Sequence, residues 1–432
     1  MSFNKKIFYK PIELLLIIII QGSILYALDC DPGEIDLGWG NCNDFIGIDN
    51  QGCMDSGCYS IGQTTELNFS YISLGSFPSN IGQLVNLTSI NISDCGMTGE
   101  IHHSVGDLSK LTFMRLGGSE LDLADSLGIS STISGYLPSS IGNLHNLEHL
   151  DLANNQLIGQ IPESFGSLSS LTHLSLANNE LSGDIPIELT NLSNLESLLL
   201  SHNNLSGTLP DDIGNLSKLY FLSMENNDLI GELPYSMSNL VSMYYLNLSS
   251  NSFDGVIPEW IGTLPLAFIY LSYNQFSGTL PVSITNLIEL VYLFLEGNQL
   301  SGYVPSGIEY IDLFYLDLSN NQFSGVIPDQ FCSIYSVSLS DNNFCPEYPQ
   351  CLNEDELGYQ ETYDCIYPGN NCTMFNGSVG FLDCDSCCWD LEYISWLGDG
   401  YCDYLGGCSW EGPRFDCIEL SYDCGDCTQE LI

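Results

Sequence analysis

The chain has 432 residues, of which 44% are hydrophobic, and its 54 acidic and 7 basic residues give a formal net charge of −47. The hydrophobic content is sufficient for a folded core and excludes general disorder. The negative charge excludes nucleic acid and anionic lipid as natural partners, and it favours basic proteins, cations or neutral sugars. Solubility in a salty medium, which screens self-repulsion, would explain the same charge.

Residues 1–27 have the layout of a secretory signal peptide. Lys5, Lys6 and Lys10 precede a short apolar run from Leu14 to Ile20, and small residues follow it. The alternative is an uncleaved membrane anchor, although the run is short for crossing about 30 Å of hydrocarbon. We therefore predict cleavage and a secreted, extracellular protein with no membrane span.

Eighteen cysteines in a secreted chain predict disulfide bonds. Four lie in residues 28–63 and twelve lie between Cys345 and Cys427, while only Cys95 and Cys332 lie between these groups. Both outer groups are even in number, which allows two bridges in the first group and six in the second. Residues 28–63 are predicted to form an N-terminal cap, and residues 346–432 an acidic, cysteine-rich C-terminal domain.

A frame of about 24 residues recurs through the middle of the chain. From Leu147 to Pro162 it has the pattern Leu-x-x-Leu-x-Leu-x-x-Asn-x-Leu-x-Gly-x-Ile-Pro. Alternation over Leu-x-x-Leu-x-Leu predicts a half-buried strand, and one copy is too small to bury its apolar face, so copies must stack. The buried asparagine is expected to satisfy backbone groups of the turn after the strand. Regular copies return at Leu171, Leu195, Leu219, Met243, Leu266, Leu290 and Leu313.

The frame resembles the plant-type leucine-rich repeat of extracellular receptor ectodomains and polygalacturonase inhibitors. The resemblance covers residues 64–345 in about eleven or twelve copies, and Phe344 to Cys351 resembles the capping segment of such arrays. It implies an α/β-type solenoid with a curved parallel sheet on the concave face, 3₁₀ or irregular segments on the convex face, and cysteine-rich caps. It also implies a non-enzymatic protein that binds its ligand on the concave face.

Positions 2, 3 and 5 of the frame are predicted to face the concave side. Exposed aromatic patches mark interaction sites, and flat rings stack on sugars and peptides. The alternative is that the rings stack on one another and only stabilise the sheet. In five consecutive copies these positions hold ten aromatic residues, predicted to bind ligand: Tyr220, Phe221, Tyr244, Tyr245, Phe268, Tyr270, Tyr292, Phe294, Phe314 and Tyr315.

Nine glycosylation sequons are present, and one of them lies among these aromatic residues, where a glycan would obstruct the surface. We expect modification at Asn68, Asn86, Asn91, Asn191, Asn204, Asn215, Asn247, Asn371 and Asn376.

Two other features of the repeats admit a functional reading. His149 and His173 occupy the same position in adjacent copies, which suggests a metal site, although surface histidines usually bind none. An insertion at about residues 117–132 is predicted to bulge from the concave edge, either as a specificity loop or as a tolerated one.

The C-terminal segment contains Trp396 to Asp403 and Tyr422 to Cys427, which resemble a divergent Lin-12/Notch-type repeat. That family binds calcium, which requires six to eight oxygen ligands. The resemblance implies a calcium site; the alternative is an acidic segment held by disulfides alone. The proposed ligands are Asp399, Asp403, Asp423 and Asp426.

Nucleotide-binding, protease and hydrolase motifs are missing from the sequence, so we predict no enzyme and no required cofactor. The favoured function is a secreted recognition protein that binds an extracellular protein or a neutral carbohydrate. The alternatives are an inhibitor of an extracellular hydrolase and a calcium-dependent structural or adhesive matrix protein. Ligand identity and oligomeric state are left open.

Overall fold

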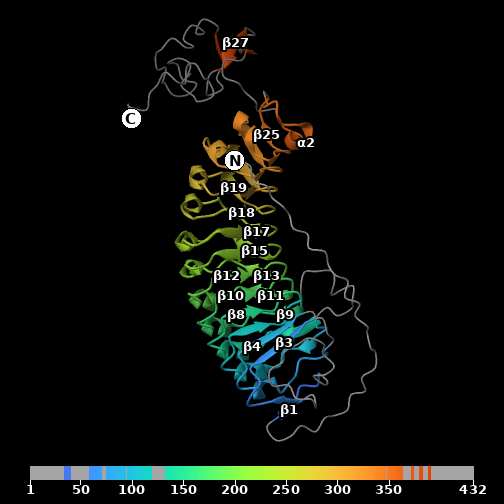
Figure 1. The fold of residues 1–432 in the computed structure, drawn as a ribbon. Helices are drawn as coiled ribbons and strands as arrows, with labels where there is room; N and C mark the ends of the chain where they lie inside the picture. The colour runs from blue at the N-terminus through green and yellow to red at the C-terminus, as the bar shows by residue number, and fades with distance from the viewer. Residues whose placement is uncertain are drawn as a thin grey trace, which may run out of the picture.

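The computed structural model describes residues 34–39, 58–70, 74–93, 95–118, 132–346 and 348–362, together with three short strands between residues 371 and 390. Figure 1 shows the described repeats as an elongated stack of coils, one per copy of the sequence frame. The leucine-rich-repeat solenoid predicted from the sequence is confirmed. In the described residues, no helix has the length and apolar character needed to cross a membrane.

The main sheet lies along the predicted concave face, and its twelve strands are all parallel. Each coil contributes one strand, and equivalent residues of neighbouring coils are in register, such as Phe221, Tyr245 and Phe268. The strands are β3 (Glu66–Ser70), β4 (Ser89–Ser93), β6 (Phe113–Arg115), β8 (His149–Asp151), β10 (His173–Ser175), β12 (Ser197–Leu199), β14 (Phe221–Ser223), β16 (Tyr245–Asn247), β18 (Phe268–Tyr270), β20 (Tyr292–Phe294), β22 (Tyr315–Asp317) and β24 (Ser336–Ser338).

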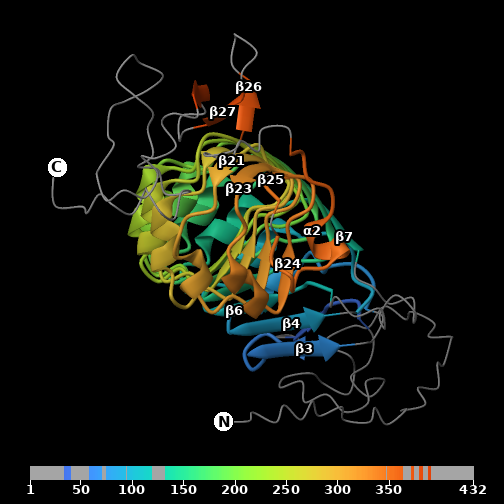
Figure 2. The ribbon, with the colours of Figure 1, turned by 90° about the horizontal axis from the view of Figure 1, so that it is seen from above.

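A second row of parallel strands follows the asparagine of each coil, where the sequence analysis expected only a turn. Figure 2 views the stack from above and shows this row, with β21 and β23, apart from β24 of the main sheet. One part contains β5 (Thr98–Glu100), β7 (Thr132–Tyr136), β9 (Gln156–Gly159), β11 (Glu180–Asp184), β13 (Asn204–Gly207), β15 (Asp228–Gly231) and β17 (Ser252–Phe253). The other contains β19 (Ser277–Thr279), β21 (Gln299–Tyr303), β23 (Gln322–Gly325) and β25 (Asn343–Phe344).

Short 3₁₀ segments form the remaining side of the coils, as predicted. Many start directly after the proline of the frame, which has extended backbone angles. Neighbouring segments pack so closely that a Cβ on Gly166 would lie 2.3 Å from the carbonyl oxygen of Glu188. They are η2 (Ile81–Gln83), η3 (His103–Asp107), η4 (Ser139–Asn143), η5 (Glu163–Ser167), η6 (Ile187–Asn191), η7 (Ile213–Asn215), η8 (Tyr235–Asn239), η9 (Glu259–Thr263), η10 (Val282–Asn286), η11 (Ile308–Tyr310) and η12 (Asp329–Ser333).

The buried asparagines connect adjacent coils through a repeating set of hydrogen bonds. The Asn203 amide nitrogen donates to the carbonyl oxygens of Leu176 at 3.0 Å and Leu200 at 3.1 Å, while its side-chain oxygen accepts from Leu181 N at 3.0 Å. Leu200 O also accepts from Asn227 of the next coil. This network fixes the spacing of the coils and therefore the spacing of the side chains on the main sheet.

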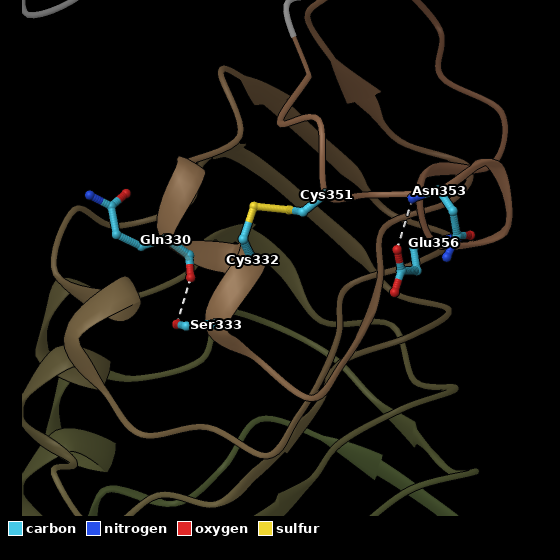
Figure 3. The surroundings of a disulfide bond; sticks show 6 residues. All are labelled: Gln330, Cys332, Ser333, Cys351, Asn353 and Glu356. Atoms are coloured by element: carbon cyan, nitrogen blue, oxygen red, sulfur yellow. Dashed lines mark hydrogen bonds between the residues drawn. A yellow bond between two sulfur atoms is a disulfide. The ribbon is translucent and has the colours of Figure 1, made fainter.

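The array continues past Cys345, where the sequence analysis ended the repeats. The Gln360 amide donates to Leu339 O at 2.8 Å and its oxygen accepts from Phe344 N at 3.1 Å, so a glutamine takes the asparagine's role in the last coil. Helix α2 (Glu354–Leu357) precedes it and begins with a capping box of Asn353 and Glu356 (Figure 3).

A disulfide joins this capping segment to the last repeat. Cys332 of η12 is bonded to Cys351, as Figure 3 shows. The even number of C-terminal cysteines allowed six bridges within that group, and this pairing is excluded because Cys351 bonds a cysteine of the repeats. Cys345 and, at the other end, Cys58 are also disulfide-bonded.

The two ends carry small antiparallel sheets. Strands β1 (Glu34–Asp36) and β2 (Cys58–Ser60) pair before the array, where Trp39 packs edge-on against Tyr59 and Phe69. Strands β26 (Asn371–Thr373), β27 (Val379–Leu382) and β28 (Cys388–Asp390) pair in the C-terminal segment.

Candidate ligand-binding face

The ten aromatic residues singled out in the sequence lie together on the main sheet. Phe221, Tyr245, Phe268, Tyr292 and Tyr315 begin five adjacent strands and are paired in register. The other predicted residues flank this row, with Tyr270 and Phe294 paired two positions further along β18 and β20. The sequence frame therefore correctly predicted that these rings share one face of the sheet, while ligand binding there stays a prediction.

The rings contact one another continuously along the sheet. Tyr220 and Tyr244 stack with ring centroids 4.8 Å apart, and Tyr270 and Phe294 stack at 5.1 Å. Tyr292 contacts Phe268 of its own row edge-on at 5.1 Å and Tyr270 of the second row edge-on at 6.4 Å, and so links the two rows. The rings therefore stack on one another along the sheet, as the alternative interpretation predicted. This stacking does not remove them from solvent, because Tyr220 and Phe221 are still 41% and 40% exposed.

One aromatic residue of this surface escaped the sequence analysis. Tyr335 precedes β24, stacks on Phe314 at 4.4 Å and is 71% exposed. Tyr335 belongs to a shortened copy that begins with Ile334, and the predicted aromatic set stopped at the copy before it. Aligning this copy on Asn342 would have placed Tyr335 at position 2 of the frame. We call Tyr335 and the ten predicted residues the aromatic strip.

A carboxylate borders the strip beside β14. Glu225 accepts a hydrogen bond from the Asn247 amide, and its Oε1 lies 3.1 Å from His202 Nε2. Burial raises the pKa of Tyr270 to about 12, with smaller contributions from Tyr245, Tyr292 and the negative charge of Glu225. The negative charge of Glu225 therefore acts on the Tyr270 phenol within the strip.

A second acidic group borders the strip three coils further on. Tyr273 donates a hydrogen bond to Glu296, which raises the pKa of the Tyr273 phenol to about 12, and burial and the negative charges of Glu296 and Asp317 add to the shift. Asp317 accepts hydrogen bonds from the Ser319 backbone and hydroxyl groups at 3.0 and 2.6 Å. Asn320 Nδ2 lies 3.5 Å from Glu296 Oε1.

The sequon at Asn247 does not present its side chain to solvent. Asn247 is 5% exposed, its amide nitrogen donates to Glu225, and its oxygen accepts from Ser249 N at 3.1 Å. A glycan on that nitrogen has no room in this arrangement, so the structure disfavours this one of the nine expected modification sites. In contrast, Asn191, Asn204 and Asn215 are exposed.

We therefore expect Asn247 to be unmodified in the folded protein, which leaves the aromatic strip bare. Secretion from a eukaryotic host followed by mass-spectrometric mapping of each sequon tests this. Asn191, Asn204 and Asn215 serve as internal controls, since their exposed side chains accept a glycan without loss of a buried contact. A glycan found at Asn247 in properly folded material would contradict the expectation.

The histidine pair lies on the same sheet, outside the strip. The rings of His149 and His173 are 5.4 Å apart, and Phe113 stacks on His149 at 4.5 Å. Burial lowers the pKa of His149, against an opposing effect of Asp151, whose carboxylate pairs with Arg115 at 3.2 Å. Across the described ranges, no three histidine, cysteine or acidic side chains group as metal ligands would.

Some predicted features lie outside the described residues. They include the signal peptide at residues 1–27, much of the two predicted terminal domains, the sequon at Asn376, most of the insertion at 117–132, and the proposed calcium ligands Asp399, Asp403, Asp423 and Asp426.

Stacked coils with a parallel sheet, an asparagine network and 3₁₀ segments define a leucine-rich-repeat solenoid. The leucine-rich repeat region family matches residues 125–228, and the leucine rich repeat family matches residues 242–264, 265–287 and 312–334. The chain belongs to the leucine-rich-repeat proteins, and its repeats are of the plant extracellular type. No curated protein matches the chain.

Several solved structures are similar to the array. The plant peptide hormone receptor RGFR1 in complex with RGF2 is 34% identical, with a TM-score of 0.57, over 66% of this chain and 48% of the receptor. The Arabidopsis receptor kinase HAESA, in complex with the peptide hormone IDA and the co-receptor SERK1, is 30% identical, with a TM-score of 0.55, over 66% and 51%. This chain thus spans about half the length of these receptor structures. A plant ice-binding protein is 26% identical, with a TM-score of 0.50, over 64% of this chain and 85% of its own.

Proposed function

We propose that the protein is an extracellular, non-enzymatic recognition protein that binds its ligand on the aromatic strip. The observation that carries this proposal is the continuous set of partly exposed rings on adjacent strands, with Tyr335 and Phe314 as its most open stacked pair. An exposed apolar surface of this kind is unfavourable in water unless a partner covers it. Elsewhere on the sheet the same position holds one further aromatic ring, Phe113, and otherwise polar residues such as Ser89, Ser197 and Ser336.

The similar receptor structures favour a peptide over a carbohydrate ligand, because RGFR1 is a peptide hormone receptor and HAESA is in complex with a peptide hormone. The predicted signal peptide at residues 1–27 supports secretion. Ice binding is not favoured, since it would need a regular threonine array. On the second sheet, the position after the glycine holds Thr208 and Thr279 but also Asp184, Glu232 and Val256.

The test replaces two rings at the centre of the strip. The double variant Tyr245→Ala/Tyr292→Ala should lose at least about tenfold in affinity for its ligand, because each ring supplies flat apolar contact area. Ligands are sought among secreted peptides and on a glycan array, and the affinity of each is then measured with purified protein. The control is Tyr235→Ala/Tyr310→Ala, which removes two phenols that are each 81% exposed and lie outside the strip.

Equal capture by wild type and the Tyr245/Tyr292 variant, with thermal unfolding showing both to be folded, would refute the proposal. Inhibition of a purified extracellular hydrolase would favour the inhibitor alternative. Calcium-dependent self-association without ligand capture would favour the matrix alternative.

A further inference from the structure

Two carboxylate groups lie along one border of the aromatic strip, at equivalent positions of coils that are three steps apart. Glu225 follows β14 and Glu296 follows β20, each two residues after its strand. The coils between them place Ser249 and Ser272 at the same position, so only small side chains separate the two acids. Asp317 adds a further negative charge beside Glu296.

No lysine or arginine within the described part of the chain neutralises these acids. Arg115 pairs with Asp151, and the Lys110 and Lys218 amines donate to Asn86 and Asn194. The only basic partner recorded there is His202, beside Glu225, and the Glu225 side chain is still 34% exposed. The formal net charge of −47 adds a long-range attraction for cationic partners.

Aromatic faces beside carboxylates suit a guanidinium or ammonium group. Such a cation stacks on a tyrosine or phenylalanine ring within about 6 Å of its centre and donates hydrogen bonds to an adjacent acid. Tyr270 provides a ring face in a coil between the two acids, and Phe294 stacks on it from the coil of Glu296. A neutral sugar would use the rings but has no need of two unneutralised acids.

The spacing between the acids matches an extended peptide. Three inter-strand steps of about 4.8 Å separate Glu225 from Glu296 by about 14 Å along the stack. In an extended chain, residues i and i+4 point to the same side and lie about 13 Å apart. A peptide that crosses the strands can therefore place one basic side chain at each acid and an apolar side chain, at i+2, on the rings between them.

We propose that the ligand of the aromatic strip is an extended basic peptide with lysine or arginine residues four positions apart, which contact Glu225 at one end and Glu296 with Asp317 at the other. This inference rests on the proposed function and assigns the chemical class of its ligand.

The probe is a fluorescent synthetic heptapeptide with arginine at positions 2 and 6 and leucine at position 4, measured by anisotropy against the full secreted chain. The comparison peptides are an isomer with adjacent arginines and a form with citrulline in place of both. We expect the spaced peptide to bind about tenfold more tightly than either, with an affinity that falls as salt is raised.

The protein variants separate local contacts from total charge. Glu225→Gln/Glu296→Gln should weaken binding of the spaced peptide about tenfold. Glu163→Gln/Glu232→Gln removes the same charge from exposed sites away from the strip and should change affinity less than about twofold. Because Glu225 also holds Asn247 and His202, Asp317→Asn provides a second test that leaves those contacts intact, and it should weaken binding about threefold.

Failure to bind the spaced peptide, equal affinity for the isomers, equal losses in the two charge-matched variants, or binding restricted to a neutral oligosaccharide would each overturn the inference. Failure of this inference can be distinguished from failure of the proposed function. If Tyr245→Ala/Tyr292→Ala abolishes capture of a ligand that Glu225→Gln/Glu296→Gln still binds fully, the strip is a recognition surface and the basic-peptide assignment is wrong.

Discussion

Replacing Asn203 with alanine should lower the free energy of unfolding by about 3 kcal/mol, because it removes the acceptor of one buried backbone N–H and one of the donors to each of three carbonyl oxygens. Leu181 N loses its acceptor, and the carbonyl oxygens of Leu176, Leu200 and Ser201 lose a donor. The loss falls on two adjacent coils at once, and stability in a solenoid depends on the interfaces between neighbouring coils. Chemical denaturation followed by circular dichroism measures the change.

The matched control is Asn239→Ala, at the exposed end of η8, which should change stability by less than about 0.5 kcal/mol. Similar losses in the two variants would show that the asparagine network contributes little beyond any other asparagine. One early coil already has another residue in place of this asparagine. Cys95 occupies the equivalent position, with its Sγ 3.2 Å from Ser93 O, so an effect smaller than expected at Asn203 would be consistent with that coil.

The sequence was sufficient to predict the stacked coils and the placement of the aromatic strip. The reason is that both depend on one repeating frame. Leu150 and Leu174 are fully buried and paired in register, so the residues beside them must point to the other face of the sheet. The same periodicity that identifies the core therefore also identifies the exposed row.

Features set by contacts between coils were harder to predict. The second row of strands depends on how closely the coils approach, since segments such as Gln156–Gly159 pair only with their neighbours in the stack. The burial of Asn247 depends on Glu225, 22 residues earlier, and a sequon motif carries no information about such a contact. The two acidic groups on the border of the strip become related only when the three-coil spacing is known.

The capping segment was missed because it departs from the frame. Gln360 satisfies the same backbone groups as the repeated asparagine, but it stands 18 residues after Asn342 and follows a helix, so no leucine pattern marks it. The number of cysteines in each region also carried no information on their pairing. Cys332 lies inside a repeat, and the repeat pattern does not indicate that Cys351 of the cap lies close to it in space.

Removing the Cys332–Cys351 bridge should destabilise the C-terminal end of the array by about 3 kcal/mol. The bridge closes a loop with a sequence separation of 19, and this is the entropy that the unfolded chain regains when the bridge is lost. We expect the cap to open before the central coils, because it ends the described array and packs against a neighbouring coil on one side, whereas a central coil has neighbours on both sides. Its hydrogen bonds to that coil include Leu339 N to Glu356 O at 2.8 Å and Asp341 N to Tyr359 O at 2.7 Å.

Hydrogen exchange of the variant Cys332→Ser/Cys351→Ser tests this, since amides of residues 339–361 should lose protection while those of the central coils keep it. Ser333→Ala is the control, because it removes only a hydrogen bond to Gln330 O beside the bridge. Tyr335, Phe314 and Tyr315 lie next to this end of the array, so an opened cap should also weaken ligand binding at that end of the strip. Unchanged protection of residues 339–361 would mean that packing of α2 and Gln360 holds the cap without the disulfide, and the strip would then keep its full affinity.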